Sequence, residues 1–227
     1  MVGRRRLGWD EYAIAWARTR GGFDPRLASP SVRRWLYGAY RVGSLLGRLW
    51  VRPIAVTVVS VLLSLLVPIV AVRQPLGPIA AAGLVLLVAA AESVRVALAV
   101  STGQSTRLGY VYDAFAERLG EAFWLTAFWL TGAPGVVVVV GGALTWLHEY
   151  VRTRAASAGM KESRVVTIAE RSSRVSTAVI GLFVAGLAGL LKAELRAGTI
   201  AVVAAVWVLL ALFGLGQLLA AVRRALR

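Results

Sequence analysis

Long apolar runs separated by short polar turns dominate the pattern of hydrophobic and polar positions along the chain. A membrane-spanning helix needs roughly 20 mostly apolar residues. Six segments reach that length, the third only when its apolar stretch 122–131 is extended back to about Gly109. Turn signals at Gln74-Pro75, 132–135 and Ala197-Gly198 divide the segments into three hairpins. The expected helices are, in chain order, 54–72, 76–100, 109–131, 135–154, 175–191 and 199–222.

Composition agrees with this pattern. Hydrophobic residues make up 58% of the 227 residues and charged residues only 16%, whereas a soluble domain has about 25% charged residues. A mean hydropathy of +0.71 is too high for a single water-soluble core. The absence of cysteine excludes a disulfide scaffold. The sequence therefore predicts an all-α integral membrane protein with six transmembrane helices.

The basic residues predict the orientation of these helices. The chain has 26 Lys and Arg against 11 Asp and Glu, and only Arg73, Lys192 and Arg196 fall on the side opposite the two termini. The positive-inside rule then places both termini in the cytoplasm, in a multi-pass protein of the inner (cell) membrane. With so apolar a chain, the positive charge favours anionic lipid and phosphate-bearing ligands as partners, and not nucleic acid.

Residues 1–52 have a different pattern and are expected to form a separate region, before a membrane domain at 53–227. We expect a cytoplasmic basic arm followed by an interfacial amphipathic helix, with Ser31 as N-cap and an end near Leu49. The alternative is a solvated arm that packs on another domain. The expected lipid-facing residues are Trp35, Leu36, Tyr40, Leu46 and Leu49, and the expected headgroup-facing ones are Arg33, Arg34, Arg41 and Arg48.

Ionisable residues inside membrane helices are costly and need a reason. Glu92 and Arg95 lie three residues apart on the second expected helix, and Asp113 and Glu117 lie four apart on the third, one turn after Gly109. Inward-pointing carboxylates from two helices would suit a hard cation such as Mg²⁺. The alternative is a cluster of ion pairs that only holds the two helices together.

The spacing of these residues resembles the signature of the CDP-alcohol phosphatidyltransferase family, D-x2-D-G-x2-A-R-x8-G-x3-D-x3-D. Gly109, Asp113 and Glu117 fit its second half, with Glu in place of the last Asp. In the first half, Glu92, Arg95, Val96, Ala99 and Val100 stand where the family has Asp, Asp, Gly, Ala and Arg. Residues 53–57 resemble the opening of the family's first helix, without its Asn. Residues 148–155 and 168–174 resemble the segments of phosphatidylinositol-phosphate synthases that hold the acceptor phosphate.

The resemblance implies a homodimer of six-helix subunits that binds a CDP-lipid and transfers its phosphatidyl group to a phosphorylated polyol. In the family, four aspartates bind two divalent metals, Mg²⁺ or Mn²⁺, which hold the diphosphate of the CDP-alcohol. Carried over by position, the resemblance assigns Asp113 and Glu117 to catalysis; Glu92, Asp113 and Glu117 to metal; Thr57, Arg95, Ala99 and Gly109 to the nucleotide; and Arg152, Arg154, Arg171 and Arg174 to the acceptor phosphate.

Arg95 departs from this pattern, because a guanidinium repels a metal ion entering the same space. We therefore expect reduced or lost two-metal catalysis, that is, a pseudoenzyme that binds anionic phospholipid or CDP-lipid and holds divalent metal weakly or not at all. Two alternatives are an active transferase that uses Mg²⁺ or Mn²⁺, and a non-catalytic membrane anchor or regulatory scaffold. For the four arginines, the alternative is a basic loop that only orients the protein in the membrane.

Overall fold

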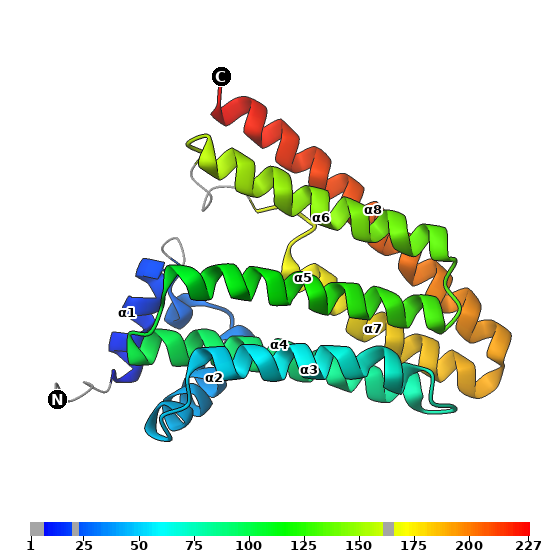
Figure 1. Cartoon of the computed structure of the whole chain (residues 1–227), viewed down its shortest axis with the longest axis horizontal. Coiled ribbons are helices and arrows are strands. Elements are labelled where there is room, and N and C mark those ends of the chain that lie inside the picture. The colour runs from blue at the N-terminus through cyan, green and yellow to red at the C-terminus, as the bar shows by residue number, and fades with distance from the viewer. Residues whose placement is uncertain (1–6, 20–22, 161–165) are drawn as a thin grey trace. The chain divides into compact units, whose positions relative to one another are not determined.

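The structure, a computed structural model, describes residues 7–19, 23–160 and 166–227, which form helices and contain no strand (Figure 1). The chain divides into two compact units, Met1–Leu62 with Val88–Glu117, and Leu63–Leu87 with Arg118–Arg227. The helices are α1 (Trp9–Thr19), the 3-10 helix η1 (Pro25–Leu27), α2 (Pro30–Arg48), α3 (Pro53–Ala71), α4 (Gly77–Thr102), α5 (Arg107–Leu130), α6 (Gly135–Ser157), α7 (Arg171–Leu191) and α8 (Ala193–Ala225).

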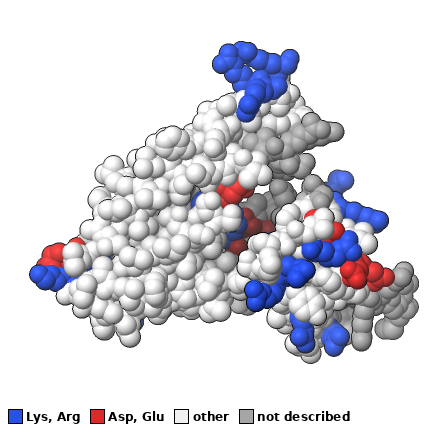
Figure 2. Space-filling view, turned by 180° about the vertical axis from the view of Figure 1, so that it is seen from behind, with Lys and Arg blue, Asp and Glu red and all other residues white. Residues whose placement is uncertain are grey.

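All six segments expected to be helical are helices, α3 to α8. Four of them, α3, α4, α7 and α8, are long and apolar enough to cross a membrane. The protein is thus an all-α, multi-pass membrane protein. The charged residues of α5 and the polar second half of α6 keep these two helices outside that set, so the count of six spans stays a prediction. Wide areas of the face in Figure 2 carry no charged side chain, and the charges gather in patches.

The ends of α5 follow from its local sequence. The helix begins two residues before Gly109, whose N–H donates to the Thr106 hydroxyl at 3.0 Å, as an N-cap side chain requires. After the helix ends at Leu130, Gly132 has φ +124°, and a Cβ there would lie 2.7 Å from the Cβ of Ala197. Only glycine suits that backbone conformation and that approach, so the turn expected at 132–135 is confirmed.

The first unit contains a helix that the hydrophobic pattern did not predict, α1. Its Tyr12 and Trp16 are buried in a cluster with Leu36 of α2. The rings of Tyr12 and Tyr40 lie 4.8 Å apart between centroids, and the Tyr40 hydroxyl donates to the carbonyl of Leu7 at 2.9 Å. Part of the expected basic arm is therefore a helix whose aromatic side chains pack against α2.

Helix α2 corrects two details of the expected amphipathic helix. It begins at Pro30 after Ser29, so Ser29 and not Ser31 is the N-cap residue, in keeping with the preference for proline at the first helical position. Leu36 is buried and Tyr40 packs against the same cluster, so these two do not face lipid. The residues that are exposed on α2 include Val32, Trp35, Val42, Leu45 and Arg33, Arg34, Arg41 and Arg48.

In the second unit, α8 packs along both α6 and α7, and α6 and α8 lie side by side in Figure 1. The buried Trp207 of α8 donates from Nε1 to the Thr145 hydroxyl of α6 at 3.0 Å. A Cβ on Gly214 would lie 2.2 Å from the Cβ of Ala169. The missing side chain at 214 therefore lets the segment before α7 lie directly on α8, which fixes the carbonyl of Ala169.

Candidate functional site

The first candidate site lies in the first unit, where α3, α4 and α5 bring together Thr57, Arg95 and Asp113. Arg95 Nη1 donates to Asp113 Oδ2 in an ion pair, and the Thr57 hydroxyl donates to Asp113 Oδ1 at 3.1 Å. The Arg95 and Thr57 residues are only 8% and 6% exposed. Each oxygen of the Asp113 carboxylate therefore has a donor from the protein itself.

The other residues that the sequence assigned to this site surround the ion pair along the helices. Ala99 is buried one turn after Arg95, and Glu92 is half-buried one turn before it. Glu117 is half-buried one turn after Asp113, and Gly109 donates its N–H to the helix cap. Within the described ranges, no group of three or more His, Cys, Asp or Glu side chains could hold a metal ion together.

These residues do not fit a pair of divalent cations. A hard cation prefers several carboxylate oxygens with free lone pairs, but Asp113 already accepts from Arg95 and Thr57. Two unit charges of the same sign about 4 Å apart repel by about 4 kcal/mol at an effective dielectric constant near 20, and a dication about doubles that figure. A metal ion beside Asp113 would have to displace Arg95 before it could bind.

The second candidate site lies in the second unit and is centred on Glu121 of α5, which is 0% exposed. Its Oε1 accepts from Arg174 Nε at 2.8 Å, from Arg171 Nη1 at 3.2 Å and from Arg118 Nη2 at 3.2 Å. Arg171 also lies over the ring of Trp124, 5.4 Å from its centroid. Three guanidinium groups from two helices thus converge on one carboxylate oxygen.

Arg174 bonds to acceptors on three segments of the second unit. Besides Glu121, its guanidinium donates from Nη1 to the carbonyl of Ala169 and from Nη2 to Glu149 Oε1 at 3.0 Å. Glu149 of α6 also lies 3.6 Å from Arg118 Nη1. Every nitrogen of the Arg174 guanidinium therefore has an acceptor, and its side chain is almost fully buried.

A third set of contacts joins α6 to the segment before α7. Arg152 Nη2 donates to Glu170 Oε1 at 2.7 Å, and the same oxygen accepts from the N–H of Thr167 at 3.1 Å. The buried His148 lies with Nε2 3.1 Å from the Thr167 hydroxyl. These bonds hold residues 167–170, which precede α7, against the second half of α6. The sequence predicts that this half of α6 lies on the cytoplasmic side.

The structure brings three of the four arginines predicted to hold an acceptor phosphate into one ionic network. Arg171 and Arg174 share the carboxylate of Glu121, and Arg152 pairs with Glu170. Glu149 joins the two groups, because it lies 3.0 Å from Arg174 and 4.0 Å from Arg152. The fourth, Arg154, is exposed on the last turn of α6.

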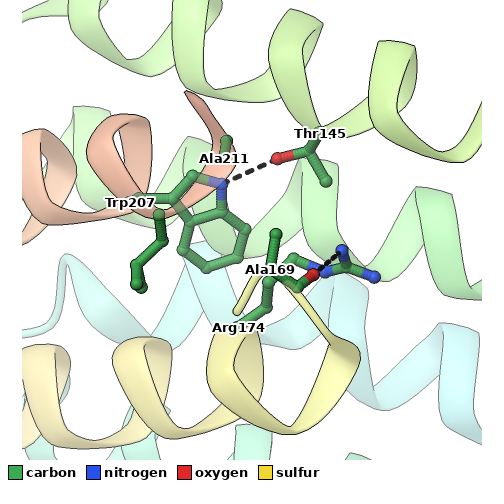
Figure 3. A pocket seen from close by; sticks show the side chains of 6 residues that line it. Thr145, Ala169, Arg174, Trp207 and Ala211 are labelled. Atoms are coloured by element: carbon green, nitrogen blue, oxygen red, sulfur yellow. Dashed lines mark hydrogen bonds between the residues drawn. The ribbon is translucent and has the colours of Figure 1, made fainter. Parts of the chain in front are cut away.

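A small cavity borders the buried end of this cluster (Figure 3). It has a volume of about 10 Å³ and is lined by Thr145, Ala169, Arg174, Trp207, Leu210 and Ala211. In Figure 3 the Trp207 ring and the Arg174 side chain lie on either side of Ala169. A cavity of this size holds about one water molecule, so it has no room for a phosphate group.

The sequence did not predict Arg118 and Glu149 of this site, nor Glu121 at its centre. Glu121 follows Glu117 by four residues, so the spacing of Asp113 and Glu117 continues for one more turn of α5. That spacing was the available signal. It says that the three acidic residues share a helix face, but it does not say which basic side chains meet them.

Comparison with known proteins finds a similar fold but no similar sequence. No protein-family model matches the chain, and no curated protein matches its sequence at a significant level. The crystal structure of Mycobacterium tuberculosis phosphatidylinositol phosphate synthase with CDP-DAG bound is similar, with a TM-score of 0.62 and 18% sequence identity. The match covers 79% of this chain and 92% of the synthase. The protein therefore shares the fold of this synthase.

Proposed function

We propose that the protein is a CDP-alcohol phosphatidyltransferase-like membrane protein of phospholipid metabolism in which two-metal catalysis is reduced or lost. It binds a CDP-lipid or an anionic phospholipid in the membrane. The observation that carries the proposal is the ion pair of Arg95 with Asp113, completed by Thr57. The fold is shared with a synthase solved with CDP-DAG bound. In this chain, Arg95 binds the Asp113 carboxylate, which the sequence assigns to metal and catalysis.

Two other functions are compatible with the same fold. An active transferase would use Asp113 and Glu117 as catalytic residues, with Mg²⁺ or Mn²⁺, to move a phosphatidyl group to a phosphorylated polyol. A membrane anchor or regulatory scaffold would retain the helical fold and the homodimer but would bind no substrate. The closed Arg95–Asp113 pair argues against the first. The dense ionic network around Glu121 supports a site built for charged groups and so argues against the second.

The proposal includes six spanning helices with both termini in the cytoplasm. We expect single cysteines at Gly135 and Ala197 to react with a membrane-impermeant maleimide only from outside intact cells, because positively charged loops stay inside. A cysteine at Ser157, the last residue of α6, is the matched control and should react only in opened membranes. The wild-type chain has no cysteine to remove. Reaction at 135 or 197 from the cytoplasmic side alone would show that the six-span topology is wrong.

The experiment that tests the proposed function is release of CMP from CDP-diacylglycerol. The purified protein is supplied with Mg²⁺ or Mn²⁺ and a phosphorylated polyol in detergent or nanodiscs. We expect no CMP above the amount released without protein, because Arg95 holds Asp113.

A further inference from the structure

Helices α7 and α8 form an apolar groove on the surface of the second unit. The groove has a volume of about 510 Å³ and lies between residues 176–184 of α7 and 199–206 of α8, with valine and isoleucine side chains forming most of its wall. Two of its hydroxyl groups are bonded within their own helices, since Thr177 donates to the carbonyl of Ser173 at 2.8 Å and Thr199 to that of Leu195 at 2.7 Å. The groove is therefore suited to an apolar ligand, and its volume is typical of ligand sites.

Two basic residues lie beyond one end of this groove, at the turn between α7 and α8. Lys192 separates the two helices, and Arg196 is on the first turn of α8, one turn before Thr199. In the predicted topology, Arg73 is the only other basic residue on this side of the membrane, where positive charges are rare. The exposed Glu194 lies two residues before Arg196 and so on another side of α8.

The side chain of Arg196 crosses from α8 to α7 at this end of the groove. A Cβ on Gly189 of α7 would lie 3.2 Å from the Cβ of Arg196 and 3.3 Å from its Cδ, so the glycine leaves room for the arginine stem. The Nε of Arg196 is buried and has no acceptor among the described residues. A buried donor without a partner is unfavourable, and an anionic oxygen bound to this guanidinium would supply the missing acceptor.

The length of the groove matches the depth of one leaflet of a bilayer. Val206, at the far end of the groove on α8, follows Arg196 by ten residues, which is about 15 Å along a helix. The hydrocarbon core of a bilayer is about 30 Å thick, so this distance is about half of it. An acyl chain whose headgroup lies at Arg196 would therefore run along the whole groove.

We infer that the hairpin of α7 and α8 binds an anionic phospholipid, with the headgroup at Lys192 and Arg196 and one acyl chain in the groove. Basic residues near the membrane surface attract anionic lipids, and the apolar wall of the groove contacts the chain. A transmembrane helix of another protein could also cover the groove, but it would not supply the acceptor that Arg196 lacks. The inference goes beyond the proposed function, because it involves none of the residues assigned to the CDP-lipid, the metal or the acceptor.

The test is native mass spectrometry of the full-length protein, delipidated in detergent and mixed with equal amounts of phosphatidylglycerol and phosphatidylcholine of the same acyl chains. We expect the wild type to retain more phosphatidylglycerol. In Arg196→Gln the ratio of the two retained lipids should fall at least about fivefold, which is equivalent to about 1 kcal/mol, the contribution typical of one basic residue near anionic lipid. Arg73→Gln is the matched control, because it makes the same change of charge at the exposed turn between α3 and α4, and should leave the ratio unchanged.

A second pair of variants tests the groove itself. Val202→Trp places a large ring in the groove at an exposed position of its wall, and should lower the retained phosphatidylglycerol at least about fivefold. Leu209→Trp, at an exposed position of α8 outside the groove, is the control and should retain as much as the wild type. The inference would be overturned by an unchanged lipid ratio in Arg196→Gln, by an equal fall in Arg73→Gln, or by wild-type retention in Val202→Trp.

Discussion

Replacing Arg95 by Asp together with Val96 by Gly is expected to raise the affinity of the protein for Mg²⁺ and Mn²⁺ by about two orders of magnitude. The change removes the cation that binds Asp113 and adds a carboxylate one turn from Glu92 on α4. Repulsion of a dication by a guanidinium about 4 Å away amounts to several kcal/mol even at an effective dielectric constant near 20. Since each 1.4 kcal/mol is about tenfold in affinity, the expected gain corresponds to about 2.8 kcal/mol, roughly a third of the repulsion on a dication at that distance. Calorimetry in detergent measures it.

The control for this variant keeps the change in net charge and moves it away from the site. Arg48→Asp alters an exposed residue on α2, so its metal affinity should remain that of the wild type. Val96→Gly alone should also leave metal affinity unchanged, because Arg95 still binds Asp113. Equal metal affinity in the wild type and in the double variant would show that Arg95 does not exclude the cations.

Replacing Arg174 by Met is expected to destabilise the second unit by about 3 kcal/mol or more, the cost typical of breaking a buried ion pair from one side. Met retains an apolar stem but leaves Glu121, Glu149 and the carbonyl of Ala169 without the donor they now share. The measurement is the free energy of unfolding in detergent, from denaturant titration followed by tryptophan fluorescence.

Two variants make this result specific to the ionic network. Arg154→Met removes an exposed arginine from the last turn of α6 and should change the free energy of unfolding by less than about 1 kcal/mol. Combining Arg174→Met with Glu121→Gln should cost less than the sum of the two single changes, because neighbours in one network are not additive. Strict additivity would mean that Arg174 and Glu121 stabilise the fold independently.

The fold could be predicted from the sequence where hydrophobicity alone determines the structure. Helices α3 to α8 follow from long apolar runs and from turn residues such as Gly132, since a spanning helix satisfies all its own backbone groups. Helix α1 could not be predicted in this way, because its stability comes from aromatic packing of Tyr12 and Trp16 against α2. The faces of α2 were assigned only in part for the same reason, since Leu36 packs against a helix that the pattern did not reveal.

The candidate site was predictable to the level of helix faces. The spacing of the family signature identified Arg95 and Asp113 as candidate site residues. The conflict between a guanidinium and a metal ion followed from their like charges. Which carboxylate Arg95 selects depends on the packing of α4 against α5, which spacing does not encode. The same is true of Glu121: its place on α5 is periodic, but the convergence of Arg171 and Arg174 on it depends on where α7 begins.

We propose that Arg95 closes the site that the sequence assigns to metal and catalysis. The most direct test is release of radiolabelled CMP from CDP-diacylglycerol by the purified wild-type protein, with Mg²⁺ or Mn²⁺ and a range of phosphorylated polyols, beside the Arg95→Asp, Val96→Gly variant. We predict that the wild type releases no more CMP than samples without protein. Metal-dependent CMP release by the wild type that EDTA abolishes would contradict the claim.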